Sequence, residues 1–312
     1  MRLLLLLSGL CLSGLCLPAA LVAETQGEGQ QSIAAKLGEK VQRFEMRTDA
    51  QGNITGLFLI NHQALAKSLG ERPGITDADL LQFRQFPKLT AVNFEAQPIG
   101  DAGLQILREF PHLRQVGFHY MAKAEGAHAS PDFIRVIDGL GHLEIIEIKH
   151  NFRMKAINVE QLQGPFPKVW RLVLDTPLTA KQTMHMIRLC PNVTDLQLHR
   201  TDVSADQLAE IGRLLPKLEV LWLKPRQGVQ AEQLAALRAF EHLRIFSPQS
   251  FKEAVPFADG WDALSAIPSL ERLELADSAR KQNAVELEQL LQQRPKLHID
   301  SRLTRSRNYK GL

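Results

Sequence analysis

Charged, histidine and aromatic residues recur at a nearly constant spacing through this 312-residue chain. The segments that contain them alternate apolar with polar residues, which is the period of a β-strand with one buried face. The last polar positions of six successive segments are Glu95, His119, Lys149, Asp175, His199 and Lys224. Side chains of these types can hold a metal ion, transfer protons or contact a partner, and the spacing of the strands decides among these uses.

The histidines His119, His150 and His199 have the residue type that metal sites use most often. If the segments are neighbouring strands about 4.8 Å apart, His119 and His199 lie about 14 Å from each other. Zinc–ligand bonds are close to 2 Å long, so these side chains do not share an ion. We therefore expect no metal, and nothing in the sequence indicates another cofactor.

Short catalytic motifs are absent from the sequence. It contains no glycine-rich phosphate loop, no G-x-S-x-G elbow and no H-E-x-x-H motif. The sequence therefore predicts a binding protein and not an enzyme.

Composition indicates a globular chain with no nucleic-acid partner. Hydrophobic residues make up 45%, which is enough for a core, and the formal net charge is only +3. Basic residues are concentrated only in the last segment, residues 300–312, which we interpret as a solvated tail.

The first 23 residues are typical of a secretory signal peptide. Arg2 precedes an apolar run, Leu3–Leu17, and small residues follow up to Ala23, after which we place the cleavage site. We therefore predict export to the periplasm or the extracellular space, without stable membrane insertion after cleavage. Retention of this segment as a membrane anchor is the alternative, because its length approaches the ~20 residues that span a bilayer.

Cleavage would remove Cys11 and Cys16 and leave Cys190 as the remaining cysteine. The mature chain then has no intramolecular disulfide, and we interpret Cys190 as a small buried hydrophobic residue.

A four-residue phrase, apolar–Pro–x–apolar, recurs nine times in exact or looser form, at intervals of 24 to 30 residues. Each copy opens the pattern L-x-x-L-x-L, whose last positions alternate as a short strand does. The copies are Phe86–Leu89, Phe110–Leu113, Leu140–Leu143, Phe166–Val169, Cys190–Val193, Leu215–Leu218, Phe240–Leu243, Ile267–Leu270 and Arg294–Leu297.

Helical spacing separates the strands. Apolar residues recur every three positions in Leu80, Phe83 and Phe86, and at i, i+3 and i+7 elsewhere, as one helical stripe requires. The proline of the phrase ends each helix. Candidate N-caps are Thr76, Thr179 and Ser204.

Two segments, Ile75–Leu80 and Ile99–Leu104, each lead into F-P-x-L-x-x-V-x-F and resemble leucine-rich repeats of the helix-containing, ribonuclease-inhibitor-like kind. The resemblance spans roughly residues 75–299. It implies an α/β solenoid of about nine coils, with a parallel sheet on the concave face, helices on the convex face and a role in protein interaction.

The sequence departs from that family in its turns. The asparagine usual after the strand is absent, and Gln97 stands in its place in the first unit. Insertions at 119–131 and 149–165 predict irregular coils, and 247–259 is predicted to be a loop.

Residues 35–74 are predicted to form an N-terminal cap. Alternating segments at 41–46 and 54–60 surround a turn in which Gly52 and Asn53 suit positive φ, so we expect a β-hairpin. Its second strand should pair beside the strand that follows Leu89, and residues 24–34 are predicted to be a mobile linker.

Outward-pointing strand residues would line the concave face, where we predict that a protein or peptide binds a monomeric chain. Tryptophan, tyrosine and arginine are favoured in binding hot spots. A solvated face with mutually neutralised charges and a carbohydrate or envelope-polymer site using the same aromatics are the alternatives. The predicted contact residues are Trp170, Trp222, His199, Lys149, Asp175, Lys224, His119, Tyr120 and Arg200.

Overall fold

The structure is a computed structural model, and it describes residues 19–61, 70–121, 129–150, 157–226, 228–248 and 260–301. Most of the predicted signal peptide, the tail after Ser301 and parts of both insertions and of the 247–259 loop lie outside these residues.

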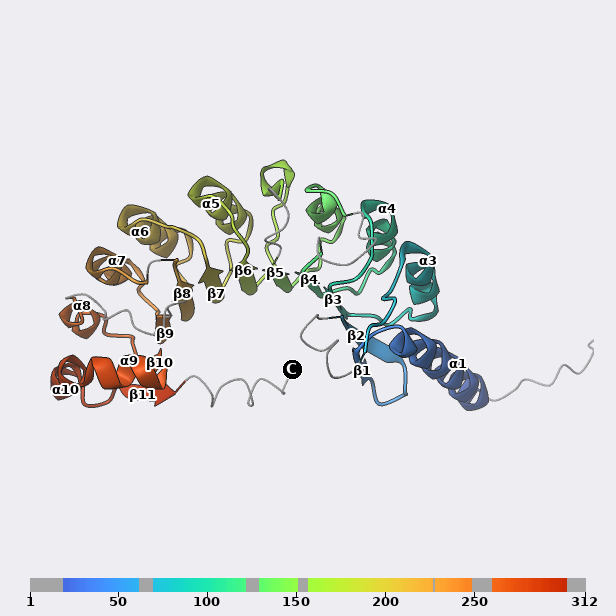
Figure 1. The fold of residues 1–312 in the computed structure, drawn as a ribbon, viewed down its shortest axis with the longest axis horizontal. Coiled ribbons are helices and arrows are strands. Elements are labelled where there is room, and N and C mark those ends of the chain that lie inside the picture. The colour runs from blue at the N-terminus through green and yellow to red at the C-terminus, as the bar shows by residue number, and fades with distance from the viewer. Residues whose placement is uncertain are drawn as a thin grey trace, which may run out of the picture.

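The described strands form one eleven-stranded sheet in chain order (Figure 1). Only the first pair is antiparallel, and every later pair is parallel. The strands are β1 Arg43–Thr48, β2 Ile54–Ile60, β3 Ala91–Glu95, β4 Gln115–His119, β5 Ile145–Lys149, β6 Arg171–Asp175, β7 Asp195–His199, β8 Val220–Lys224, β9 Ile245–Pro248, β10 Arg272–Leu275 and β11 His298–Ser301.

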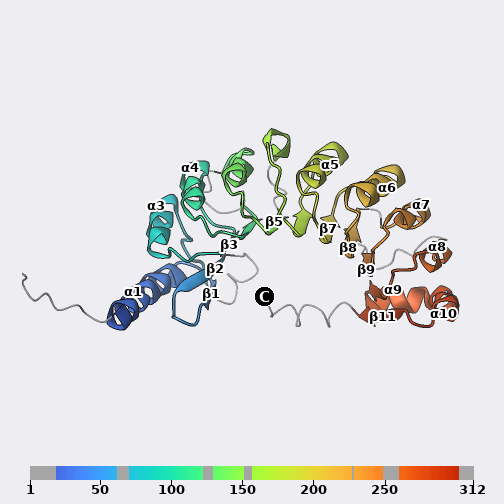
Figure 2. The same ribbon diagram turned by 180° about the vertical axis from the view of Figure 1, so that it is seen from behind.

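Each of the nine phrases leads into one strand, from β3 to β11, and the predicted strand positions pair residue for residue. Val92 faces Val116, which faces Ile146, and the same register continues through Leu172. The inward side chains of these strands are fully buried. The predicted leucine-rich-repeat solenoid, with its sheet on the concave side and its helices on the convex side, is confirmed (Figures 1 and 2).

Hydrogen-bonded turns join the helices to the strands. In eight of the nine phrases the last residue donates its backbone N–H to the carbonyl of the first, as Leu89 does to Phe86 at 3.0 Å. Proline suits the second position of such a turn because its φ is already fixed near the required value. The phrase therefore ends the helix and also aims the chain into the next strand.

The convex side contains both α- and 3₁₀-helices. Stripes with a spacing of three, such as Leu104 and Leu107, lie in segments that continue as 3₁₀-helix, whereas Leu208 and Ile211 lie in a ten-residue α-helix. The α-helices are α3 Asp77–Leu80, α4 Asp101–Leu104, α5 Ala180–Leu189, α6 Ala205–Leu214, α7 Ala231–Ala236, α8 Asp262–Ser265, α9 Asp277–Gln282 and α10 Ala284–Gln293, and the 3₁₀-helices are η1 Leu81–Gln85, η2 Gln105–Glu109, η3 Phe133–Gly139, η4 Val159–Gln161 and η5 Leu237–Ala239.

The predicted N-caps are confirmed, and their partners also connect coils. Thr179 accepts a hydrogen bond from the backbone of Gln182, whose side chain in turn accepts from the Thr179 backbone. The Gln182 amide also donates to the carbonyl of Ile157 in the preceding coil. Gln97 has a comparable buried role after β3, where it donates to the carbonyls of Leu59 and Glu95.

Residues 24–34 are not a linker, because they lie in helix α1, Ala19–Glu39. From Gln30 on, the residues at i, i+4 and i+7 are Gln30, Ala34 and Leu37, and all three are buried. The Gln30 side chain accepts a hydrogen bond from the Ile54 backbone at 3.0 Å. The segment is mostly polar, so its composition did not indicate a buried helix face. Glutamine, glutamate and alanine nevertheless favour helices. Within the described residues, no helix is long and apolar enough to span a membrane.

The β1–β2 hairpin is confirmed, and β2 pairs in parallel with β3 as predicted. Gly52 has a φ of 78°, but Asn53 is not in the left-handed region, so that part of the turn prediction is wrong. Asn53 instead donates backbone and side-chain hydrogen bonds to the carboxylate of Asp49.

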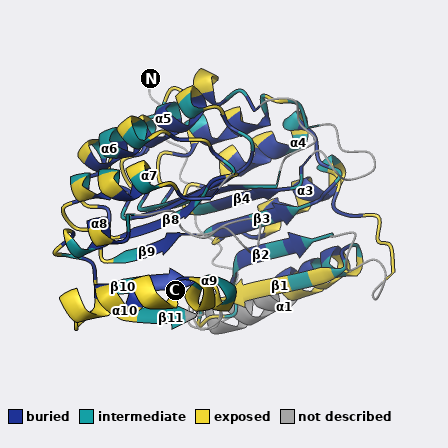
Figure 3. Ribbon diagram, turned by 60° about the vertical axis from the view of Figure 1, so that its left-hand side comes forward, coloured by how far each residue is buried: buried dark blue, intermediate teal, exposed yellow. Residues whose placement is uncertain are grey.

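Neighbouring helices approach so closely that Gly212 in α6 has no room for a side chain. A Cβ there would lie 2.7 Å from the carbonyl oxygen of Ala239 in the next coil, whereas a Cβ at Gly29 in α1 would meet nothing within 4 Å. Figure 3 shows that most strands of the array consist mainly of buried residues, whereas the helices mix buried with exposed residues.

We expect Gly212→Ala to lower the free energy of unfolding by about 1–3 kcal/mol, because overpacking outweighs the gain in helix propensity. Gly29→Ala is the matched control and should leave stability unchanged or raise it by about 0.5–1 kcal/mol. Urea unfolding followed by circular dichroism measures both. Equal stabilisation by the two changes would contradict the close approach of the coils.

Candidate functional site

The concave side of the sheet places the predicted polar residues in one row. Glu95 faces His119, which faces Lys149, and the row continues in register through Asp175 and His199 to Lys224. We define the concave strip as this row together with the neighbouring residues Tyr120, Glu147, His150, Arg171, Asp195, Arg200 and Trp222. Figure 1 shows these strands at the centre of the inner curve.

Glu147 on β5 is the centre of the first charge cluster. Its carboxylate lies 2.7 Å from the Lys149 ammonium and 3.5 Å from both His119 Nε2 and the Arg171 guanidinium. His119 also approaches Glu95 at 3.7 Å, and Arg171 approaches Asp195 at 3.6 Å. The cluster therefore links β5, β6 and β7 through ion pairs, and the contacts of His119 extend it to β3 and β4.

Burial and charge act in opposite directions on Glu147. Burial of its carboxyl group would raise the pKa, because the charged form loses contact with water. The charges of Lys149, His119 and Arg171 outweigh burial and hold the pKa of Glu147 well below its ordinary value. The carboxylate therefore stays ionised and depends on these neighbours.

Asp175 on β6 is the centre of the second charge cluster. Its carboxylate lies 3.3 Å from His199 Nδ1, 3.5 Å from His150 Nδ1 and 3.5 Å from Arg200 Nε. Burial would raise the pKa of Asp175, but the close contact with His199 and the charges of His199, His150 and Arg200 lower it overall. The Asp175 carboxylate thus contacts polar side chains from the coils on both sides of its own.

The residue after four of the strands adopts a left-handed backbone conformation, with φ of 52° at Ala96, 53° at Tyr120, 58° at His150 and 60° at Arg200. Each such non-glycine residue costs about 1–2 kcal/mol of backbone strain. The Tyr120 and His150 rings stack with their centroids 4.6 Å apart. Burial raises the pKa of Tyr120 and lowers that of His150.

Exposure divides the concave strip into two groups. His119, Asp175 and His199 are buried, whereas Lys149 and Lys224 are partly exposed. Tyr120, Arg200 and Trp222 are partly exposed as well. The buried members fix the geometry of the strip, and the partly exposed members are those that a ligand can reach.

The structure adds two details to the predicted contact residues. Lys149 lies beside Asp175 in the sheet and forms an ion pair with Glu147 on its own strand. Trp170 is not on the concave row, because it precedes β6 and bonds through its backbone to Glu144 and Thr194 at the start of the neighbouring strands. Trp222 lies in register with Gln197 and Ser247, so the two tryptophans do not flank one row.

Sequence reasoning left Glu147, Arg171 and Asp195 out of the predicted contact residues. All three occupy outward positions of the strand alternation, two or four residues before the predicted row. That alternation could have indicated them. Their mutual pairing could not be inferred, because it depends on side-chain conformations across neighbouring strands.

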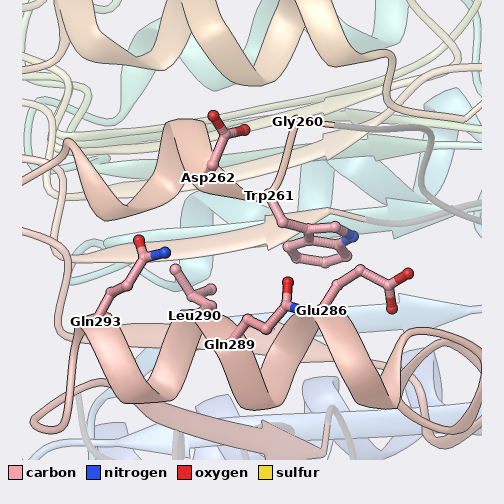
Figure 4. A pocket seen from close by; sticks show the side chains of 7 residues that line it. All are labelled: Gly260, Trp261, Asp262, Glu286, Gln289, Leu290 and Gln293. Atoms are coloured by element: carbon pink, nitrogen blue, oxygen red, sulfur yellow. The ribbon is translucent and has the colours of Figure 1, made fainter.

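The described residues contain no group of three His, Cys, Asp or Glu side chains arranged to hold a metal ion. Two hollows occur away from the concave strip. One, of about 180 Å³, lies between Trp261 and helix α10 (Figure 4), and the other, of about 480 Å³, lies near the start of strands β7 to β10. Buried Cys190, whose pKa burial raises to about 12, carries no reactive thiolate.

The sequence matches no protein-family model and no curated protein. An internalin (inlF) from Listeria monocytogenes is 12% identical, with 91% of this chain and 74% of that chain covered and a TM-score of 0.45. A protein from Bacteroides fragilis is 14% identical, with coverages of 73% and 69% and a TM-score of 0.41. Internalin C2 (inlC2) from Listeria monocytogenes is 12% identical, with coverages of 88% and 93% and a TM-score of 0.35. The assignment of the fold rests on the repeats and the strand register.

We expect Glu147→Gln to lower the free energy of unfolding at neutral pH by about 3 kcal/mol, because it leaves Lys149 and Arg171 without their carboxylate. Since the pKa of Glu147 is lower in the folded than in the unfolded protein, its contribution is complete above about pH 4 and is lost as the pH falls through the folded value.

Wild-type protein should therefore lose more stability than the variant as the pH falls from about 4 to about 2. Urea unfolding across this range measures the difference. Glu232→Gln, at an exposed position of α7, is the control and should keep the wild-type profile. Parallel profiles for wild type and Glu147→Gln would contradict the cluster.

Proposed function

We propose that the chain is a non-catalytic interaction scaffold that binds a protein or peptide on its concave strip. The observation that carries this proposal is that side chains of the strip contact one another across neighbouring coils, around Glu147 and Asp175. Its buried carboxylates are neutralised by neighbouring cations, so the strip is held in one arrangement before a partner arrives. Pre-organisation lowers the entropy that binding would otherwise lose.

The partly exposed members give the strip its contact chemistry. Tyr120 and Trp222 offer aromatic surface, and Arg200, Lys149 and Lys224 offer hydrogen-bond donors around it. Aromatic residues and arginine dominate protein hot spots. We therefore propose a partner segment that supplies acidic or carbonyl groups to these donors and an apolar side chain to the aromatic residues.

A carbohydrate or envelope polymer on the same aromatics receives less support. A stacking platform needs aromatic faces in line along one path, but Trp170 lies at the start of β6 while Trp222 lies in the middle of β8. Tyr120 already stacks on His150. The distribution of aromatic residues therefore favours a protein or peptide on this face.

Export is part of the same proposal. The apolar segment Leu3–Leu17 after Arg2 supports secretion to the periplasm or the extracellular space, where a monomeric chain would meet its partner. Ribonuclease-inhibitor-like repeats describe the helix-containing coils best, and we propose that subtype on the resemblance of the repeats.

We expect Trp222→Ala/Arg200→Ala to abolish capture of the partner from native envelope extract when residues 24–312 are the bait. Both substitutions remove contact groups. Arg200→Ala also removes one partner of Asp175, whereas the cluster around Glu147 is unchanged. Arg188→Ala, on the convex helix α5, is the control and should capture the same protein as wild type. Circular dichroism verifies that all variants fold.

Trp170→Ala, tested alone, shows whether the start of β6 contributes to the same interface. Recovery of the same protein by wild type and by Trp222→Ala/Arg200→Ala would contradict the concave strip as the binding surface.

A further inference from the structure

A second polar surface runs along the edge of the array where each helix turns into its strand. We call it the corner edge and define it by the third residue of each turn. Seven of these nine residues are lysine or histidine, and none is acidic. They are Lys88, His112, His142, Lys168, Asn192, Lys217, His242, Ser269 and Lys296. All nine are at least partly exposed.

Repetition of the turn makes the corner edge continuous. Eight of the nine turns close with the same backbone hydrogen bond, so successive coils present the third residue at equivalent places. Adjacent strands are about 4.8 Å apart, so the side chains of neighbouring corners are close enough to contact one ligand. Two such contacts are recorded, Lys168 with His142 at 2.9 Å and Lys217 with Asn192 at 3.3 Å.

Several carboxylates near the corner edge are already paired. Arg244 binds Glu219 at 3.2 Å and Glu271 at 2.9 Å, and Arg114 binds Glu144 at 3.2 Å. These ion pairs occupy the row two residues further along the chain. The lysines of the corner edge therefore keep charge that these carboxylates do not neutralise.

Exposed cations lie beside the sixth and seventh turns, in which Glu241 is the one acidic residue. Arg213 and Arg238 stand two residues before the phrase and are exposed, near Lys217 and His242 of the same corners. Among the described residues, no carboxylate forms a recorded ion pair with Arg213, Lys217 or Arg238. Exposed cations of this kind attract an anionic ligand at modest cost in desolvation.

The hollow of about 480 Å³ lies on this part of the corner edge. Lys217, His242 and Ser269 line it from the corners, and Thr194, Glu219, Arg244 and Glu271 line it from the next row. All seven side chains are polar, so the groove can exchange hydrogen bonds with a hydroxyl-rich ligand. Lys217 can also bind an acidic substituent of that ligand.

Exposed large hydrophobic side chains are lacking at the described corners. The exposed large hydrophobic residues of the described chain are Met46, Leu81, Val285 and Leu291, and none is a corner residue. Membrane insertion needs apolar residues that reach the acyl region, and protein hot spots need apolar anchors. The edge therefore fits neither a bilayer nor a protein as well as a polar, charged polymer.

We propose that the corner edge binds a linear polysaccharide bearing carboxylate, sulfate or phosphate groups, which lies in the groove and crosses successive coils. This surface is distinct from the concave strip and does not depend on the protein partner proposed there. Polymer binding at the edge would hold the chain on an acidic polymer while the concave strip remains accessible.

The test measures binding of heparin and polygalacturonate, with neutral dextran for comparison, by isothermal titration calorimetry at low and high salt. Wild type should bind both acidic polymers, more weakly at high salt, and should not bind dextran. Arg213→Glu/Lys217→Glu should weaken binding about tenfold at low salt, because two attractive contacts become repulsive.

Lys181→Glu/Lys281→Glu changes the net charge by the same amount at exposed sites on α5 and α9 and should bind as wild type does. Circular dichroism verifies that both variants fold. Equal weakening of polymer binding by both double variants would mean that net charge alone explains the binding, and it would overturn the proposal. Phosphatidylglycerol vesicles are titrated in the same way. Absence of polymer binding by the wild type, or binding only to these vesicles, would overturn the proposal as well.

Discussion

The parallel hydrogen-bond register, which keeps equivalent positions of the repeats opposite one another from β3 to β10, is the constraint on which the rest of the structure depends. Since each coil contributes one strand at the same height, equivalent residues from repeats 24 to 30 positions apart become lateral neighbours. The turn phrase maintains this height, because its proline and its backbone hydrogen bond direct every strand alike. Core, concave strip and corner edge are three consequences of the same register.

The same register explains why the core changes composition along the array without changing shape. The first coils stack Phe83, Phe94 and Phe118, with ring centroids 6.1 and 6.5 Å apart, and later coils place leucines at the strand positions. Each coil contacts mainly its neighbours, so a volume change is compensated within one or two repeats. At the N-terminal end, α1 and the β1–β2 hairpin cover the face that the first coil would otherwise expose.

Strands, turns and sheet order were predictable from the sequence because period-2 alternation and a nine-fold phrase define them independently. The inserts were predictable as irregular, and only the short η4 lies between β5 and β6 among the described residues. Helix α1 was not predictable from composition, since its buried face consists of Gln30, Ala34 and Leu37, of which one is polar. In the concave strip, register gave the row of His119, Asp175 and His199, but the choice of ion-pair partner depends on side-chain rotamers. Trp170 was misplaced because strand alternation does not extend through the corner that precedes β6.

The central claim is that the concave strip is a coupled network formed across coils, and a double-mutant cycle on Glu147 and Arg171 tests it most directly. Unfolding free energies of Glu147→Gln, Arg171→Gln and the double variant give the coupling between two strands. We expect a coupling free energy of about 1–2 kcal/mol for this buried pair. For the exposed Arg84–Glu109 pair on the convex side we expect at most about 0.5 kcal/mol. Coupling at Glu147 and Arg171 no larger than that of the exposed pair would contradict a pre-organised concave strip.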